Sequence, residues 1–363
     1  PNNPGHQYSD EYYNVSTTDM EAVLNLAVEI KINGILAYAS DPAALTAAYV
    51  SEKLGLPGNS FDVVKIMSDK DLFRKFMDEN GFTCPESRAF QTYKEAYIWT
   101  CTLNDDFIIK PVDSSGSKGV QVIKNGKEFY DEFRVALSFS RKGKVIIERF
   151  ITKKGFQIGG DGFVVDGKLI FRCFGDIHFS KTNPLLPCSV SMPSLHNQKI
   201  IEKIHDEIQN LISKIGLKMG ALNFDVMIDE NEQVNIIEIG PRNGGNMIPE
   251  LTEFCTSVDM KSASILQSVG EDFPEMKIGK EDKYFSHYVI HAQKTGIVKS
   301  FTMSEELKRC ILYSHLNFEI GDIVQRFDSS ANRLGIMLIK YQSKDEMLNL
   351  IYNMDKNLII NIE

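Results

Sequence analysis

Residues 221–242 read ALNFDVMIDENEQVNIIEIGPR, with an apolar run on each side of a polar Asp-Glu-Asn-Glu turn. This pattern predicts a β-hairpin whose second strand ends at the proline. With a two-residue turn at 230–231, Asp225 faces Ile236, and Glu238 lies diagonally from Asp225 on the same face. We therefore predict two carboxylates on one face of a hairpin whose other face packs into a core.

Two carboxylates held this close repel each other unless a cation lies between them. Hard oxygen ligands suit Mg²⁺ that carries phosphate oxygens. Acids on a solvent-facing hairpin are also common, so the hairpin alone leaves a metal site and a solvated surface as alternatives. Glu238 stands within Ile-Ile-Glu-Ile, and this apolar neighbourhood favours the metal site.

Two glycine-rich segments add candidate phosphate-binding groups. Residues 110–119 read KPVDSSGSKG between two expected strands, so their backbone N–H groups can converge on a polyphosphate beside Lys110. The order of a Walker A loop is absent, and a flexible hairpin with a solvated lysine is the alternative. Residues 240–246 read GPRNGGN, in which Arg242 can bind a carboxylate or a transferring phosphoryl group. The alternative there is a strand-to-helix loop with a surface arginine.

The N-terminal part alternates expected helices and strands, which indicates an α/β unit with a parallel sheet. Capping residues followed by apolar residues at helical spacing mark the helices. We expect helices that start at Thr18, Ser40 and Ser68, the second ending near Gly55 and the third at Asn80-Gly81, and strands at 12–15 and 35–39.

From Phe107 onward, short apolar stretches predict a small antiparallel α+β unit with Asp166-Gly167 as a hairpin turn. An amphipathic helix at 200–215 precedes the carboxylate hairpin. A charged segment at 271–283 is a predicted linker, and the residues after it alternate strand and helix. The further strands expected are 107–112, 120–123, 145–150, 163–165, 169–174, 335–341 and 358–362, with a helix at 344–354.

Composition narrows the function classes. The chain has 40 basic and 49 acidic side chains, a net charge of −9 and no basic cluster, which argues against nucleic-acid binding. Its 6 cysteines show neither zinc-ligand nor disulfide spacing. No apolar run approaches the roughly 20 residues that span a bilayer. We therefore expect a cytoplasmic enzyme or binding protein with neither a membrane nor a nucleic-acid partner.

Lys70, Lys110 with its glycine-rich loop, and the carboxylate hairpin resemble, in this order and spacing, the ATP-grasp superfamily. The layout is similar to L-amino acid ligases and to stand-alone proteins like the carbamoyl-phosphate synthetase large chain. The resemblance implies an ATP-grasp fold of mixed α/β and α+β class. Its units are a Rossmann-like domain at 1–64 without its first strand and helix, an ATP-grasp domain at 65–275 with a lid at about 107–175, and a small C-terminal α+β domain at 276–363.

The resemblance also implies nucleotide-binding residues. Lys70 resembles the family lysine near the α-phosphate, and Lys110 resembles the second nucleotide lysine, beside the loop that closes over the β- and γ-phosphates. Gln157 stands where many members have a ribose-binding glutamate. The loop residues implied are Ser114, Ser115, Gly116, Ser117, Lys118 and Gly119, and the adenine-binding hinge consists of Glu148, Arg149, Phe150 and Ile151.

The metal and catalytic residues follow from the same resemblance. Asp225 and Glu238 match the two metal carboxylates. Arg242 matches the catalytic arginine, and Lys110 is the second catalytic residue. Many members carry an asparagine two residues after the second acid, where this sequence has Gly240. Asn243 is therefore the alternative third metal ligand.

The resemblance implies an ATP-dependent carboxylate–amine ligase, an ADP-forming carbon–nitrogen ligase that uses ATP with Mg²⁺ or Mn²⁺. Phosphorylation of an amino acid or a sugar acid gives an acyl phosphate, which an amine attacks. Two alternatives remain open: a biotin-independent carboxylase or carbamoyl-transfer enzyme, and a non-catalytic ATP-binding regulatory module. The oligomeric state is left open, with a homodimer as the assembly that the resemblance suggests. Arg172, Asp176, His178 and the loop 183–193 lie where such ligases build the acceptor pocket, with a structural role as the alternative for the histidine.

Overall fold

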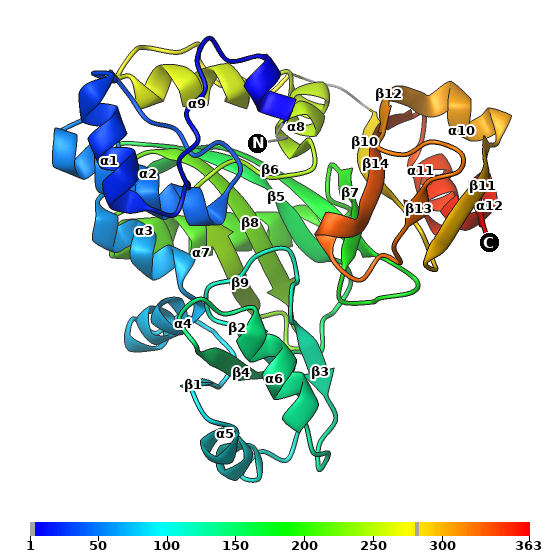
Figure 1. Cartoon of the computed structure of the whole chain (residues 1–363), viewed down its shortest axis with the longest axis horizontal. Helices are drawn as coiled ribbons and strands as arrows, with labels where there is room; N and C mark the ends of the chain where they lie inside the picture. Colours follow the sequence, from blue (N-terminus) through cyan, green and yellow to red (C-terminus); the bar gives the residue numbers. More distant parts are fainter. Residues whose placement is uncertain (1–3, 280–282) are drawn as a thin grey trace.

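The computed structural model describes residues 4–279 and 283–363. An eight-stranded antiparallel sheet, in the order β12-β14-β10-β7-β6-β5-β8-β9, forms the centre of the molecule. It extends from the C-terminal unit to the middle of the molecule, and a smaller sheet lies below it (Figure 1). The eight strands are β5 (Gln157–Val165), β6 (Lys168–Phe179), β7 (Pro187–Met192), β8 (Gly220–Ile228), β9 (Val234–Gly240), β10 (Tyr284–His291), β12 (Ile311–Leu316) and β14 (Arg333–Tyr341).

A sharp turn joins β5 to β6 in the middle of this sheet. Asp166 and Gly167 both have left-handed backbone, with φ of 49° and 76°, as a type I′ hairpin turn requires. The predicted Asp-Gly turn is therefore confirmed. β5 also pairs with β8, so the strand that carries Asp225 lies between two neighbours.

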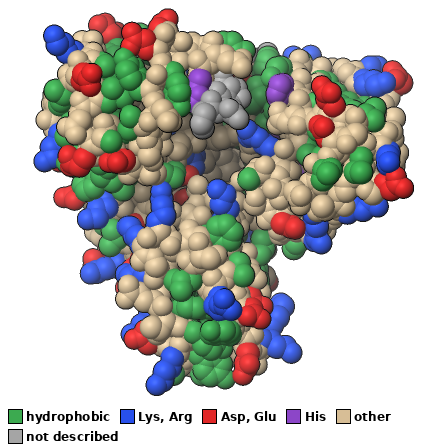
Figure 2. Space-filling model, viewed as in Figure 1, with side chains coloured by type: hydrophobic (Ala, Val, Ile, Leu, Met, Phe, Trp, Pro, Cys, Tyr) green, Lys and Arg blue, Asp and Glu red, His purple; other side chains and the backbone are tan. Residues whose placement is uncertain are grey.

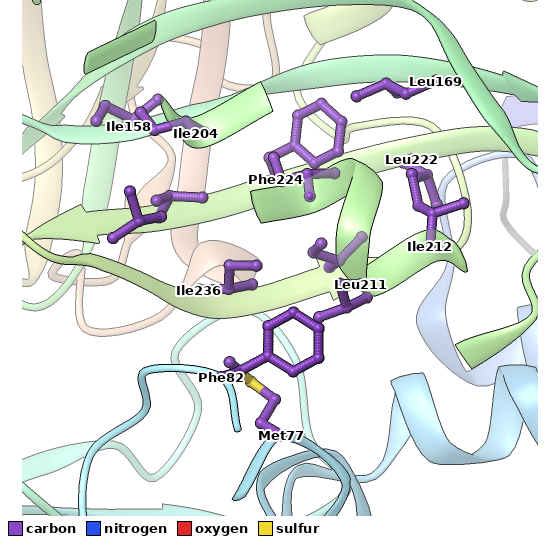
Figure 3. Packing of buried hydrophobic residues seen from close by; sticks show 14 of the residues in the cluster. Met77, Phe82, Ile158, Leu169, Ile204, Leu211, Ile212, Leu222, Phe224 and Ile236 are labelled. Carbon is purple, nitrogen blue, oxygen red and sulfur yellow. The ribbon is translucent and has the colours of Figure 1, made fainter. Parts of the chain in front are cut away.

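Helix α7 (Gln198–Ile215) covers one face of the sheet. Asn197 accepts a hydrogen bond from the first turn, and Gly216 ends the helix at a φ of 79°. The apolar side chains of α7 recur at helical spacing and pack against Phe224 and Leu222 of β8 (Figure 3). Helices α8 (Ile248–Thr256) and α9 (Met260–Ser268) pack on the opposite face of the sheet.

A four-stranded sheet in the order β1-β4-β2-β3 forms a separate small unit with its own aromatic core. The lid predicted at 107–175 is wrong at both ends. The unit already begins with β1, and the two strands predicted last, β5 and β6, belong to the large sheet because they pair with β8 and β7. Its elements are β1 (Ser87–Phe90), α5 (Tyr93–Thr100), β2 (Phe107–Pro111), β3 (Gln121–Ile123), α6 (Tyr130–Ser138) and β4 (Val145–Arg149).

Within residues 4–86 the N-terminal unit is helical. The strands predicted at 12–15 and 35–39 do not form, so the predicted parallel sheet is wrong for the described residues. Both segments lack a neighbouring strand there, and an extended segment becomes a strand only through such a ladder. The elements are a 3₁₀ turn η1 (Pro4–Gln7), α1 (Met20–Glu29), α2 (Asp41–Leu54), α3 (Phe61–Ser68) and α4 (Lys70–Glu79).

Aspartates cap two of these helices in place of the predicted residues. Asp19 rather than Thr18 accepts an N–H of the first turn of α1, and Asp69 rather than Ser68 accepts two N–H groups of α4. The predicted end of α2 at Gly55 is confirmed by its left-handed φ of 65°. Placing Asp69 as the cap makes Lys70 the first residue of α4.

The C-terminal unit combines its own small sheet with three strands of the large one. β10, β12 and β14 lie in the large sheet, which therefore continues across the predicted boundary at 276. The predicted linker 271–283 includes residues 280–282, which lie outside the described residues. The remaining elements are β11 (Gly296–Met303), α10 (Glu305–Cys310), β13 (Ile323–Val324), η2 (Ser330–Asn332), α11 (Lys344–Tyr352), α12 (Met354–Asn357) and β15 (Leu358–Ile362).

Helix length and polarity bear on the membrane prediction. α7 spans 18 residues, but charged side chains alternate with its buried ones. Among the helices of residues 4–279 and 283–363, none combines the length and apolar character needed to cross a membrane.

Candidate active site

The two carboxylates of the hairpin lie directly opposite each other. Asp225 of β8 pairs with Glu238 of β9, whereas the next residue, Val226, pairs with Ile236. Ile237 is therefore an extra residue in β9, which makes a β-bulge. The predicted register is wrong by two residues, one in the turn, where Asp229 pairs with Gln233, and one at this bulge. The two shifts together leave Asp225 and Glu238 on one face.

Asp225 lies in surroundings that oppose its ionisation. Burial and the neighbouring Glu238 outweigh a hydrogen bond from Gln157 and raise the pKa of Asp225 to about 6. That bond runs from Gln157 Nε2 to Asp225 Oδ1 at 2.5 Å. The side chain of Glu238 remains 35 % exposed. The pair is thus a concentrated negative charge that a cation would stabilise.

Lys110, the second-to-last residue of β2, lies within a buried ion cluster. Its Nζ donates to Glu148 Oε2 at 2.6 Å, and Arg74 of α4 donates Nε–H to Glu148 Oε1 at 2.9 Å. Burial lowers the pKa of Lys110. Burial also opposes the charge of Glu148, but the two cations outweigh it and lower the pKa of Glu148 to about 2. Both oxygens of this predicted adenine-binding acid are therefore bonded to cations.

The hinge after β4 is fastened to neighbouring segments. Arg149 forms ion pairs with Glu86 and Asp105, each at 2.8 Å. The backbone N–H groups of Arg149 and Phe150 donate to carbonyls that precede β1 and β2. These groups already have partners, so an adenine ring would have to bind to the remaining backbone and side-chain groups of residues 148–151. The adenine-binding role of the hinge stays a prediction.

Lys70 links the glycine-rich loop to the carboxylate hairpin. Its Nζ donates to the Ser114 carbonyl at 2.9 Å and lies 3.6 Å from Glu238 Oε2. Two glycines of the loop have left-handed backbone with φ of 70°, a conformation that a side chain would strain. The lysine, the loop and one carboxylate of the pair thus come together.

A cavity of about 260 Å³ opens between this loop and α2. Thr46 of α2 is among the residues that line it, and the buried hydroxyl of this residue has no hydrogen-bond partner. Figure 2 shows a hollow between the N-terminal helices, the small sheet and the C-terminal unit, with Lys and Arg side chains along its rim. The lining includes Asp41, Thr46, Lys70, Ser114, Ser115 and Glu238.

Arg242 is held by the first residue of α2. Its Nε and Nη2 donate to the two oxygens of Asp41 at 2.7 and 2.9 Å. Nη1 donates to the Asn243 carbonyl at 3.1 Å. This bidentate pair ties the loop 240–246 to the N-terminal unit and fixes the direction of the guanidinium.

Asn243 is bonded to α9, so the structure contradicts its predicted role as a third metal ligand. Its side chain is fully buried, and Nδ2 donates to Ser264 Oγ at 3.0 Å. Its backbone N–H donates to the Tyr38 carbonyl. The buried amide therefore serves to hold the loop between the N-terminal unit and α9.

Two buried charged residues of the site escape the sequence analysis. Asp161 of β5 accepts hydrogen bonds from Gly244 N–H and Asn223 Nδ2, both at 2.8 Å, and burial raises its pKa to about 6. The sequence feature that could have indicated Asp161 is a single acid within an apolar stretch. Nothing in the sequence indicates Arg74, because one charged residue on an amphipathic helix is usually a solvated one.

Three predicted acceptor-pocket residues, Arg172, Asp176 and His178, lie on the face covered by α7. The register pairs Gln157 with Ile177, so the even-numbered residues of β6 point away from the carboxylate pair. They do not face that pair, and their role in an acceptor pocket stays a prediction, while part of the predicted loop 183–193 forms β7. Their partners are Glu202, Ser194 and Ser191, respectively.

Taken together, two lysines, two carboxylates and a glycine-rich loop converge from α4, β2, β8 and β9. Such an arrangement can hold a polyphosphate with a divalent cation. The ion cluster of Lys110 supplies positive charge on one side, and the hairpin supplies metal-ligand oxygens on the other.

Comparison with known proteins agrees with this arrangement. The ATP-grasp domain family matches residues 103–250. The carbamoyl phosphate synthase large chain of Thermotoga petrophila is 22% identical over 277 residues, which cover 74% of this chain and 24% of that protein. Across the first curated relatives, the matched part covers between 24% and 55% of their length.

Solved structures share the fold over a longer stretch. The L-amino acid ligase from Bacillus licheniformis has a TM-score of 0.80 at 19% identity, covering 95% of this chain and 84% of that chain. Phosphoribosylglycinamide synthetase from Anaerococcus prevotii has a TM-score of 0.74 at 21% identity, covering 98% and 90%. The chain therefore contains an ATP-grasp domain and has the ATP-grasp fold along nearly its whole length.

Proposed function

We propose that the protein is an ATP-dependent carboxylate–amine ligase that phosphorylates a carboxylate, releases ADP and joins the acyl group to an amine. The observation that carries this proposal is the direct opposition of Asp225 and Glu238, with Lys70 3.6 Å from Glu238. Paired carboxylates beside lysines and a glycine-rich loop suit a nucleoside triphosphate with its metal. The fold shared with an L-amino acid ligase supports the same reaction class.

The carboxylate pair fits Mg²⁺. Among the described residues, no cluster of three or more His, Cys, Asp or Glu is placed to hold a metal ion, so the protein would supply two carboxylates and the nucleotide the remaining oxygens. When bound, Mg²⁺ would neutralise phosphate charge and align the transferring group. Burial and Glu238 raise the pKa of Asp225, which means that its charged form is unfavourable without a cation. A bound cation would stabilise this charged form.

The chain's own residues then have distinct tasks. Lys70 and Lys110 hold phosphate oxygens and neutralise charge that grows during phosphoryl transfer. The loop 113–119 closes over the phosphates and excludes water, so that the acyl phosphate meets an amine instead. Arg242 can bind a substrate carboxylate in place of Asp41, while its Nη1 keeps the bond to the Asn243 carbonyl.

The decisive experiment incubates the protein with ATP, Mg²⁺ and pairs of substrates, amino acids or sugar acids as carboxylates with amino acids or simple amines. We expect ADP and phosphate only when a carboxylate and an amine are both present, together with the ligated product in the mass spectrum. ADP release that needs bicarbonate would favour the carboxylase or carbamoyl-transfer alternative. Tight MgATP binding without release for any pair would favour a regulatory module.

One observation speaks for the regulatory module. Gln157, in place of a ribose-binding glutamate, donates to Asp225 Oδ1 and so occupies one oxygen of the carboxylate pair. A single hydrogen bond to an uncharged amide is weak against a divalent cation, so the ligase remains the better-supported function.

The glycine-rich loop should respond to nucleotide. It is fastened through the Ser114 and Gly116 carbonyls, which accept from Lys70 and Ser330, whereas phosphates would be held by its N–H groups. We expect MgATP to slow amide hydrogen exchange in 113–119 by about tenfold or more, as for a closing loop. The hairpin turn 229–232 is the internal control and should not change. Full protection without nucleotide would contradict the prediction.

A further inference from the structure

Arg74 is buried at the junction of three elements. It lies on α4, is 4% exposed and donates Nε–H to Glu148 Oε1 of β4 at 2.9 Å. Its Nη1 donates to the Ile236 carbonyl at 3.3 Å, and its Nη2 donates to the Ile237 carbonyl at 2.9 Å. One guanidinium therefore joins the small sheet to β9 of the large sheet.

The two carbonyls belong to the bulge that places Glu238. Ile236 still pairs with Val226, while Ile237 is the extra residue that brings Glu238 opposite Asp225. A bulge leaves backbone groups without ladder partners, and Arg74 supplies donors to them. Figure 3 shows Met77, one turn further along α4, beneath Ile236, so packing also fixes the helix against β9.

The other end of the guanidinium sets the charge around Lys110. Glu148 shares its two oxygens between Arg74 and Lys110, so the cluster of two cations and one anion is net positive. Without Arg74, Lys110 and Glu148 would form a neutral pair, and an incoming phosphate would meet no net charge. The positive charge that Lys110 presents thus depends on Arg74.

We propose that Arg74 is a positioning residue that couples the two halves of the nucleotide site, holding the phosphate lysine through Glu148 and the metal carboxylate through the bulge. This inference rests on the proposed use of ATP and its metal at Lys110 and Glu238. It assigns Arg74 no contact with nucleotide. Its effects are transmitted through Glu148 and the β9 backbone.

The test compares Arg74→Met with Arg74→Lys. The first change removes the charge, and the second keeps the charge but lacks the planar guanidinium with its several N–H donors. Lys75→Met is the matched control, because Lys75 is the next residue on α4 and forms an exposed pair with Glu79. For each protein, the dissociation constant of ATP is measured by calorimetry, once in EDTA and once with excess Mg²⁺. The ratio of the two constants reports the metal half of the site, and the constant in EDTA reports the phosphate half.

We expect Arg74→Met to weaken ATP binding in EDTA by at least about tenfold, the scale of a lost charge-assisted contact, and to shrink the Mg²⁺ ratio as well. Arg74→Lys should keep the EDTA constant within about threefold, because the charge remains, but should still shrink the Mg²⁺ ratio, because one ammonium cannot serve Glu148 and both carbonyls. Lys75→Met should match wild type in both constants. If Arg74 served folding alone, Arg74→Lys would not keep the dissociation constant in EDTA while losing part of the Mg²⁺ ratio.

Two outcomes would overturn the inference: Arg74→Lys with a wild-type Mg²⁺ ratio, or a folded Arg74→Met with both constants unchanged. If Arg74→Met fails to fold, Arg74→Lys alone decides the question. Failure of the proposed function looks different. The Arg74 effects on MgATP binding would then appear as expected, while no carboxylate–amine pair would release ADP in the wild-type protein.

Discussion

Glu238→Gln should lower ATP-dependent turnover by about 10²-fold or more, the scale of losing one preorganised electrostatic contact in a transition state. The change keeps the shape of the side chain but removes half of the charge that would hold the metal. Its direct partner Asp225 cannot compensate, because burial and Gln157 already limit its charge and its free oxygens. Turnover is measured as ADP release with a saturating substrate pair.

The same variant should fold as well as wild type. Repulsion between Asp225 and Glu238 is relieved, and only a 3.6 Å contact with Lys70 is lost. The melting temperature without ligand should stay level or rise, while the additional stabilisation by MgATP over ATP in EDTA should shrink. Glu232→Gln, on the exposed turn of the same hairpin, is the control and should change neither. An unfolded Glu238→Gln, together with wild-type ATP binding that ignores EDTA, would make the carboxylate pair structural.

Lys110→Met should abolish detectable turnover, because methionine fills the space of the lysine stem but offers phosphate no charge. The change should also lower stability, because Lys110 belongs to the buried ion cluster with Glu148 and Arg74. Glu148 would keep Arg74 as a partner but lose Lys110, so we expect unfolding in urea to show a loss of about 1–3 kcal/mol, as for a buried charge that loses one partner.

Lys124→Met provides the matched control for Lys110→Met. Lys124 follows β3 in the same small sheet, but its ion pair with Asp106 is solvent-exposed, and such pairs contribute little. Its turnover and stability should equal those of wild type. Wild-type ADP release by Lys110→Met would remove Lys110 from the phosphate site, whatever its stability.

The carboxylate hairpin shows what sequence patterning can and cannot predict. Alternation of apolar and polar residues predicted Asp225 and Glu238 on one face, and they share it because the bulge compensates a one-residue shift in the turn. Their direct opposition depends on Ile237, an inserted residue whose carbonyl accepts from Arg74 on a helix far away in sequence. Parity within a strand is local, whereas a bulge is stabilised by tertiary partners, and a single sequence does not reveal those.

The errors elsewhere have the same origin. Residues 35–39 have a strand-like composition, but their neighbours in space decide whether a ladder forms. The apolar stretches 163–165 and 169–174 are short and indicate a small antiparallel unit, yet the pairing of β5 and β6 with β8 and β7 puts them in the large sheet. Asn243 matched a ligand by position in sequence, and burial against Ser264 gave its amide another partner.

The continuity of the large sheet decides where this chain can be cut and recombined. β7 pairs with β10 from Ser189 to Met192, so a truncation before Tyr284 would leave β7 as an open, aggregation-prone edge. The small sheet differs, since among the strands of the described residues its four strands pair only with one another. Residues 87–149 are therefore the natural cassette for exchange with another ligase, whereas the C-terminal unit has to be kept with the sheet that it completes.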